Sequence, residues 1–114
     1  MGKKTRSELL LPGTLEILIL KTLSLQTMHG YGIAQHIKKV SEAVLKVEEG
    51  SLYPALQRLL VKRFVTAEWR QSERNRRARF YRITAAGRRQ LEADQSGFLD
   101  HFDAIRRLLR STEV

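Results

Sequence analysis

Arginine is the residue type in this sequence whose arrangement most clearly indicates a chemistry. One stretch of ten residues contains five arginines and a single acidic residue, Glu73. These arginines are Arg70, Arg74, Arg76, Arg77 and Arg79. A planar guanidinium group donates two parallel hydrogen bonds to a phosphate, and it also enters narrow minor grooves, where the potential of DNA is most negative. The stretch therefore predicts binding to a polyanion, with a solvated basic loop as the alternative.

The overall composition agrees with a polyanionic partner. The 114 residues include 21 Lys and Arg against 12 Asp and Glu, which gives a net charge of +9. Such a charge concentrates polyanions at the surface, with nucleic acid the first candidate and an anionic membrane surface the second. No apolar run approaches the ~18 residues that a membrane span requires. The absence of cysteine excludes disulfides and fits a reducing compartment, so we expect a cytoplasmic protein.

No group of residues in the sequence predicts catalysis. His29, His36 and His101 are far apart and lack the spacing of metal ligands. The segment 30–32 (Gly-Tyr-Gly) is only part of a phosphate-binding glycine motif, and the acidic pair 48–49 is explained by the dipole of the helix that follows. We therefore expect no enzymatic activity, no metal site and no cofactor.

Two helices are predicted in the first third of the chain. Residues 14–25 are apolar nearly all round, which is typical of a central core helix, and Thr14 is the expected N-cap. A second helix begins around Tyr31 and ends near Ser41. Its free N–H groups at Tyr31 could hold a phosphate, although an ordinary turn explains the sequence equally well. Residues 44–47 alternate apolar and polar side chains, which predicts a short strand.

A third helix is the candidate recognition helix. Proline is tolerated in the first turn of a helix, so Pro54 places the N-cap at about Gly50 or Ser51. An α-helix fits the major groove of B-DNA and presents side chains to base edges. Gln57 could pair with adenine, Arg58 could reach guanine or phosphate, and Tyr53 could bond a phosphate or pack half-buried. The candidate DNA contacts on this helix are Ser51, Tyr53, Pro54, Gln57 and Arg58.

A basic hairpin is predicted after the third helix. Residues 64–70 and 79–83 alternate and are rich in aromatic and β-branched side chains, and the segment 71–78 between them is polar and basic. Following three helices, such a hairpin corresponds to a wing. Its candidate DNA contacts are Arg74, Arg76, Arg77 and Arg79. Lys3, Lys4 and Arg6 are expected to form a basic arm that adds non-specific attraction.

The end of the chain predicts one long helix with a dimerisation face. Thr84 is the expected N-cap, and Gly87 and Gly97 weaken the helix, so that a break near Gly97 is one alternative. An apolar stripe on this helix consists of Leu91, Phe98, Phe102, Ile105 and Leu109. Pairing with a second copy would bury the stripe, and packing back on its own domain is the alternative.

Four motifs in this order and spacing resemble the PadR-like transcriptional regulators. They are Leu11–Glu16, His29–Ile33, Glu49–Leu56 and Arg79–Gly87, and the resemblance covers roughly residues 9 to 92. The sequence is most similar to a short subgroup described in Acidobacteria, through Glu68–Trp69 and Asn75–Ala78 in the wing.

The resemblance implies a winged-helix domain, a single C-terminal dimerisation helix and repression that a small molecule relieves. Some relatives bind flat aromatic compounds at the dimer interface with the help of an aromatic residue on the last helix. Phe98 is in about that place, where the subgroup often has tryptophan, so the resemblance makes Phe98 and Phe102 the candidate effector pocket. Residues 62–64 lack the glycine that many relatives have before the first strand of the wing.

The sequence therefore predicts a mainly helical α+β fold: a winged helix-turn-helix with a two-stranded wing and a C-terminal dimerisation helix. The expected divisions are a basic arm (1–8), a DNA-binding domain (9–83) and a dimerisation helix (84–114). The expected function is a sequence-specific, homodimeric repressor that binds double-stranded DNA and is released by a small hydrophobic effector, without a membrane partner. The alternative is an effector-binding or protein-interaction module with only secondary DNA contact.

Overall fold

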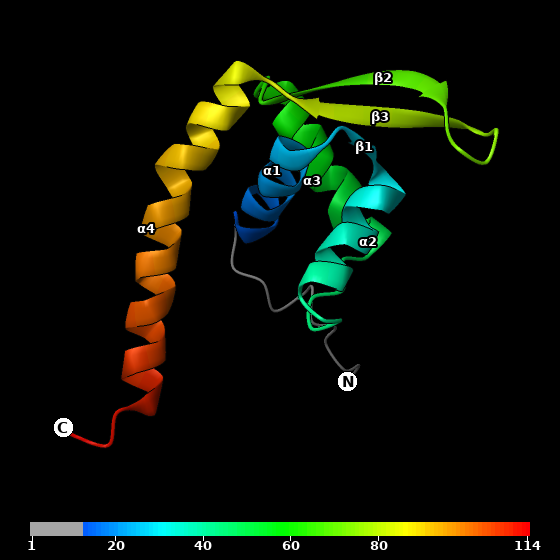
Figure 1. The fold of residues 1–114 in the computed structure, drawn as a ribbon. Helices are drawn as coiled ribbons and strands as arrows, with labels where there is room; N and C mark the ends of the chain where they lie inside the picture. The colour runs from blue at the N-terminus through cyan, green and yellow to red at the C-terminus, as the bar shows by residue number, and fades with distance from the viewer. Residues whose placement is uncertain (1–12) are drawn as a thin grey trace.

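The computed structural model describes residues 13–114, so the predicted arm (1–8) with Lys3, Lys4 and Arg6 lies outside the described residues. Three helices form the body, a three-stranded antiparallel sheet lies beside them, and a long last helix leaves the body (Figure 1). The sheet order is β1-β3-β2. The elements are α1 (Thr14–Leu25), β1 (Met28–His29), α2 (Gly30–Val40), α3 (Glu49–Val61), β2 (Val65–Gln71), β3 (Arg77–Ile83) and α4 (Ala85–Arg110).

The core of the domain forms around α1, as its nearly uniform apolar character predicts. Ile19 is fully buried, and Leu20 and Leu23 are nearly so. The other helices each contribute an apolar face, with Ile33 from α2 and Leu56 from α3. The predicted N-cap of α1 is wrong, because Thr14 is already helical and the cap is Gly13, whose φ of 86° suits glycine.

The helix α2 forms as predicted, and His29 caps its N-terminus. The Nδ1 atom of His29 accepts a hydrogen bond of 2.9 Å from the backbone N–H of Gly32. The predicted strand at 44–47 is wrong: this segment is irregular and follows two residues with left-handed backbone, Glu42 and Ala43. An alternating pattern gives a strand only where a partner strand is available, and the sheet is completed instead by β1, which pairs with β3.

The helix α3 begins earlier than Pro54 suggests. Its N-cap is Glu48, whose backbone carbonyl accepts hydrogen bonds from the N–H groups of Ser51 and Leu52. Pro54 therefore lies in the second turn, and the predicted N-cap at Gly50 or Ser51 is wrong. The proline leaves the carbonyl of Gly50 without its usual helical donor, and this is tolerated because both residues are exposed to solvent.

The wing is longer than predicted and belongs to a larger sheet. The strands β2 and β3 pair from Val65–Ile83 to Gln71–Arg77, and residues 72–76 form the turn. The turn is closed by a hydrogen bond of 2.7 Å from the N–H of Ser72 to the carbonyl of Arg76. The strands β2 and β3 form the predicted two-stranded wing, and β1 pairs along the free edge of β3, which makes a three-stranded sheet.

The helix α4 is capped as predicted and is unbroken. The Oγ1 atom of Thr84 accepts the N–H of Gly87 at 3.0 Å, and the helix continues through Gly97 to Arg110. Leu91, predicted to take part in dimerisation, is only 6% exposed and belongs to the core of its own domain. This corrects the predicted stripe, because the first turns of α4 already pack on α1. The rest of α4 leaves the body, and the radius of gyration is 15.8 Å, against about 13 Å for a compact domain of 100 residues (Figure 1).

Within residues 13–114, none of the helices combines the length and the apolar character needed to cross a bilayer.

Candidate nucleic-acid interface

The strand β3 places two of the predicted arginines on one face of the wing. Side chains alternate along a strand, so Arg77 and Arg79 share a face with the buried Tyr81. In the paired strand β2, Trp69 lies opposite Arg79 on the same face. We call this side of the sheet, which continues the surface of the core beyond the helices, the inner face of the wing.

The strand register removes Arg70 from this group. Arg70 pairs with Ala78 in the sheet and therefore lies on the outer face. Its guanidinium is 3.3 Å from the carboxylate of Glu68 and 4.5 Å from the centre of the Phe80 ring. The cluster of five arginines in the sequence is thus divided between two sides of the wing.

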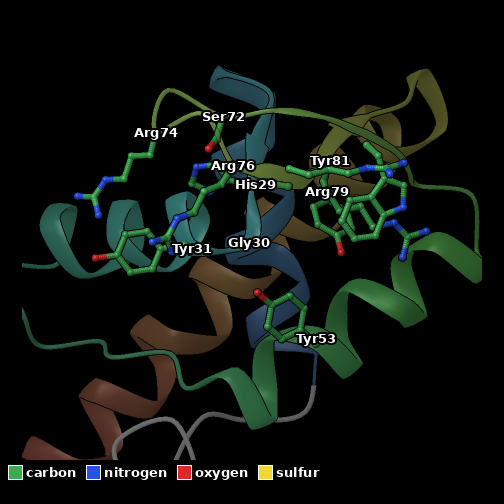
Figure 2. Close-up of a pocket in the computed structure, with 12 residues that line it drawn as sticks. His29, Gly30, Tyr31, Tyr53, Ser72, Arg74, Arg76, Arg79 and Tyr81 are labelled. Carbon is green, nitrogen blue, oxygen red and sulfur yellow. The ribbon is translucent and has the colours of Figure 1, made fainter.

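A cleft of about 760 Å³ lies between the inner face of the wing and the helices. In Figure 2, Tyr53 reaches from α3 toward Gly30, and the arginines of the wing lie on the other side of the cleft. Predicted and unpredicted residues meet here. The lining consists of His29, Gly30, Tyr31, Tyr53, Trp69, Ser72, Arg74, Arg76, Arg77, Ala78, Arg79 and Tyr81.

Aromatic rings hold the strand arginines in this cleft. The guanidinium of Arg77 lies 5.4 Å from the centre of the Trp69 ring, and that of Arg79 lies 5.8 Å from the Tyr81 ring. Such contacts orient a guanidinium without neutralising its charge. In the described part of the chain, neither arginine has a carboxylate within 4.0 Å. Their charges are therefore available to an anionic partner.

Tyr53 is fixed in the floor of the cleft by the backbone of α2. A Cβ atom at Gly30 would lie only 2.9 Å from the hydroxyl oxygen of Tyr53, so the absence of a side chain at Gly30 allows the close approach. Tyr53 remains 45% exposed and lines the cleft. Partial burial raises the pKa of Tyr53 above its usual value of 10.0, and nearby Glu49 and Tyr81 add to the rise. The phenol is therefore protonated at neutral pH and can donate a hydrogen bond.

The other predicted contacts on α3 are divided between an exposed stripe and a flank. Pro54 and Gln57 are exposed along the middle of the stripe, and Ser51 is half-buried beside it. Arg58 lies on the flank and is held by Glu16 of α1, with 2.6 Å from both its Nε and one Nη atom to Oε1 of Glu16. Tyr31, at the start of α2, is exposed and lines the cleft.

The predicted dimerisation residues beyond Leu91 lie on the part of α4 that leaves the body. The rings of Phe98 and Phe102 stack with their centres 6.4 Å apart. Phe98 is half-buried, whereas Phe102, Ile105 and Leu109 are exposed. An apolar stripe therefore faces solvent over the last turns of the helix.

In residues 13–114, no three residues of the types His, Cys, Asp and Glu come close enough together to hold a metal ion.

The family model described as the transcriptional regulator PadR-like family matches residues 19–93, about two thirds of the chain. The chain belongs to this family. Membership agrees with the expectation that the protein is a regulator and not an enzyme.

Solved PadR structures have the same fold. A PadR family transcription regulator from Clostridium difficile is 26% identical, with 85% of this chain and 99% of that chain covered and a TM-score of 0.71. A PadR-like transcriptional regulator from Bacillus cereus is 27% identical, with 87% and 94% covered and a TM-score of 0.71. Bacillus subtilis PadR in complex with operator DNA is 22% identical, with 71% of this chain but 46% of that chain covered and a TM-score of 0.63. The match to the complex supports the fold, which is the predicted winged helix-turn-helix with a long C-terminal helix.

Six residues that line the cleft of this PadR-like protein were not among the predicted contacts. They are His29, Gly30, Trp69, Ser72, Ala78 and Tyr81. The sequence analysis placed His29 and Trp69 in motifs of the family and Tyr81 in a strand, but it gave none of the three a role in DNA binding. Strand alternation could have identified Tyr81, which shares a face with the predicted contact Arg79, and it puts Trp69 on the face opposite to Arg70. Nothing in the sequence indicated that His29 lies beside the wing, because β1 is too short to be recognised from its periodicity.

Proposed function

We propose that this PadR-like protein is a sequence-specific regulator that binds double-stranded DNA as a homodimer in the cytoplasm, and that it belongs to the short subgroup described in Acidobacteria. The observation that carries the DNA-binding proposal is the cleft, in which Arg77 and Arg79 face residues of α2 and α3, and neither guanidinium has a carboxylate partner within residues 13–114. The operator complex of Bacillus subtilis PadR supports it as a precedent within the family.

In the proposed complex, residues 9–83 form the DNA-binding domain and α3 enters the major groove. Gln57 on the exposed stripe reads a base edge, and Ser51 and Tyr53 hydrogen-bond at the rim of the groove. The wing lies over the neighbouring DNA backbone, where its arginines bind phosphates or enter the minor groove. Tyr31 at the start of α2 contacts a phosphate from the other side of the cleft.

Binding of the chain to DNA upstream of its own gene, measured against salt concentration, tests this proposal. Each neutralised phosphate contributes about −0.9 to the slope of log affinity against log salt, so several arginine contacts give a steep dependence. We expect tight binding to one short region, a steep slope and a clear preference over random DNA of equal length. A shallow slope, or equal affinity for random DNA, would contradict the proposal.

Residues 84–114 are proposed to be the dimerisation segment, through the exposed part of the apolar stripe. Phe102→Glu should shift the protein from dimer to monomer, because it introduces a charge into the stripe at a side chain that is 49% exposed in the single chain. Sedimentation measures the change. The matched control is Ser96→Glu on the same helix, which should stay dimeric. Ser96 is exposed and lies two residues before Phe98, so it is turned by about 200° from the stripe. A Phe102→Glu protein that stays dimeric would contradict this use of the stripe.

We further propose that the protein is a repressor and that a small hydrophobic effector binds next to Phe98 and Phe102. A hydrophobic dye should bind the dimer, and Phe98→Ala should reduce that binding about tenfold while DNA affinity remains, because the substitution removes one of two stacked rings. Dye fluorescence and promoter binding are the two measurements. Strong dye binding with only weak, non-specific DNA binding would favour the alternative, an effector-binding or interaction module.

A further inference from the structure

Arg58 differs from the arginines of the wing in having a charged partner. Its Nε and one Nη atom both lie 2.6 Å from Oε1 of Glu16, a residue 42 positions earlier in the sequence. The side chain of Glu16 is 17% exposed, so its carboxylate is mostly withdrawn from water, whereas the side chain of Arg58 is 53% exposed. The ion pair thus connects α1 to the outer part of α3.

The geometry of the pair leaves one end of the guanidinium free. A guanidinium has five N–H donors in a fixed plane. Glu16 accepts from the edge formed by Nε and one Nη atom. The remaining donors point away from this edge. They are the N–H groups of the second Nη atom and the outward hydrogen of the Nη atom that is bonded to Glu16. They form the pair that binds O6 and N7 of a guanine end-on.

The position of Arg58 places this free end beside the base-reading surface. Successive residues of a helix are turned by about 100°, so Arg58 and Tyr53 lie on opposite sides of the stripe through Pro54 and Gln57. Tyr53 lines the cleft beneath the wing. Arg58 therefore stands at the border of α3 that is far from the wing, next to Gln57.

We propose that Glu16 is a positioning residue that makes Arg58 a directional reader of guanine. This inference rests on the proposed function. The Glu16–Arg58 pair has no net charge, so it adds little to the attraction of arbitrary phosphates, on which non-specific binding depends. Its fixed orientation strengthens only a contact whose acceptors match the free end. Glu16 thus raises the ratio of specific to non-specific affinity.

The test is Glu16→Gln in the full chain, with dissociation constants measured for the operator, for random DNA and for operators substituted at each guanine. We expect the ratio of operator to random affinity to fall about tenfold, within the range that one bidentate base contact supplies. Affinity for random DNA should stay equal or rise, because the charge of Arg58 is no longer neutralised. The preference for guanine should be lost at one operator position for each subunit.

Two further variants keep the inference open to contradiction. Arg58→Lys retains the charge but loses the fork, so it should lower the ratio to the same extent, and combining it with Glu16→Gln should add nothing. The matched control is Glu68→Gln, which removes the partner of Arg70 on the outer face of the wing and should leave the ratio unchanged.

The results separate this inference from the proposed function. A wild-type protein without any preference for its operator contradicts the proposed function itself. A specific wild-type protein whose ratio is unaffected by both Glu16→Gln and Arg58→Lys contradicts only the role of Glu16. A lower melting temperature with an unchanged ratio would likewise show that the ion pair only joins α1 to α3.

Discussion

Replacing Arg77 and Arg79 together with alanine should lower the affinity for operator DNA by at least about 100-fold. Hydrogen bonds to charged groups contribute about 1.5–3 kcal/mol each, and about 1.4 kcal/mol corresponds to a factor of ten in affinity. Both guanidiniums lie on the inner face of the wing, over Trp69 and Tyr81, without a carboxylate partner in the described part of the chain. The loss should be similar for operator and random DNA, and the slope of log affinity against log salt should become shallower by about two per subunit.

The matched control for this prediction is Arg70→Ala. It removes one positive charge from the same hairpin, against two in the double variant, but Arg70 lies on the outer face and is paired with Glu68. We expect its affinity to fall by less than about threefold, since exposed, paired charges contribute little. Fluorescence anisotropy with a labelled operator measures all three proteins. A loss of binding free energy for Arg70→Ala that is half or more of the loss for the double variant would mean that net charge, and not the inner face, holds the DNA.

The parts of the fold that depend on local patterns could be predicted from the sequence. The apolar character of 14–25 gave the central helix, and Thr84 gave the cap of α4, because each signal lies within a few residues of the structure that it specifies. The basic hairpin was predicted for the same reason. Its exact register was not: the predicted second strand began at Arg79, whereas β3 begins at Arg77, and this difference decides which arginines share a face.

Features that depend on distant residues could not be predicted. Nothing local in the sequence relates Glu16 to Arg58, because the two residues lie in different helices. Leu91 fits the same heptad spacing as Phe98, but its burial depends on where α1 lies. A periodic stripe shows which face of a helix is apolar, and only the tertiary structure shows where the domain stops covering that face.

Gly87 shows the same dependence, and Gly87→Ala should be strongly destabilising. From the sequence, Gly87 only weakens a helix, so alanine should stabilise it by up to about 1 kcal/mol. In the structure, a Cβ atom at Gly87 would lie 2.1 Å from the backbone oxygen of Phe64 and 2.8 Å from Cγ1 of Ile83. That oxygen accepts the N–H of Thr84 at 3.0 Å, so the contact cannot be relieved without moving the start of α4. Because overpacking costs about 1–3 kcal/mol or more, we expect a net loss of about 2 kcal/mol and a melting temperature lower by roughly 10 °C.

Gly97→Ala is the matched control, since it makes the same substitution in the same helix. No atom would lie within 4 Å of its Cβ, and Gly97 is turned by about 100° from Phe98 of the apolar stripe. The gain in helix propensity should therefore appear there undiminished, as a melting temperature higher by a few degrees. Calorimetry of both variants at one protein concentration gives the comparison, because the melting of a dimer depends on concentration. If both variants were stabilised, the first turn of α4 would not pack against Phe64, and the anchoring of α4 on the DNA-binding domain would have to be reconsidered.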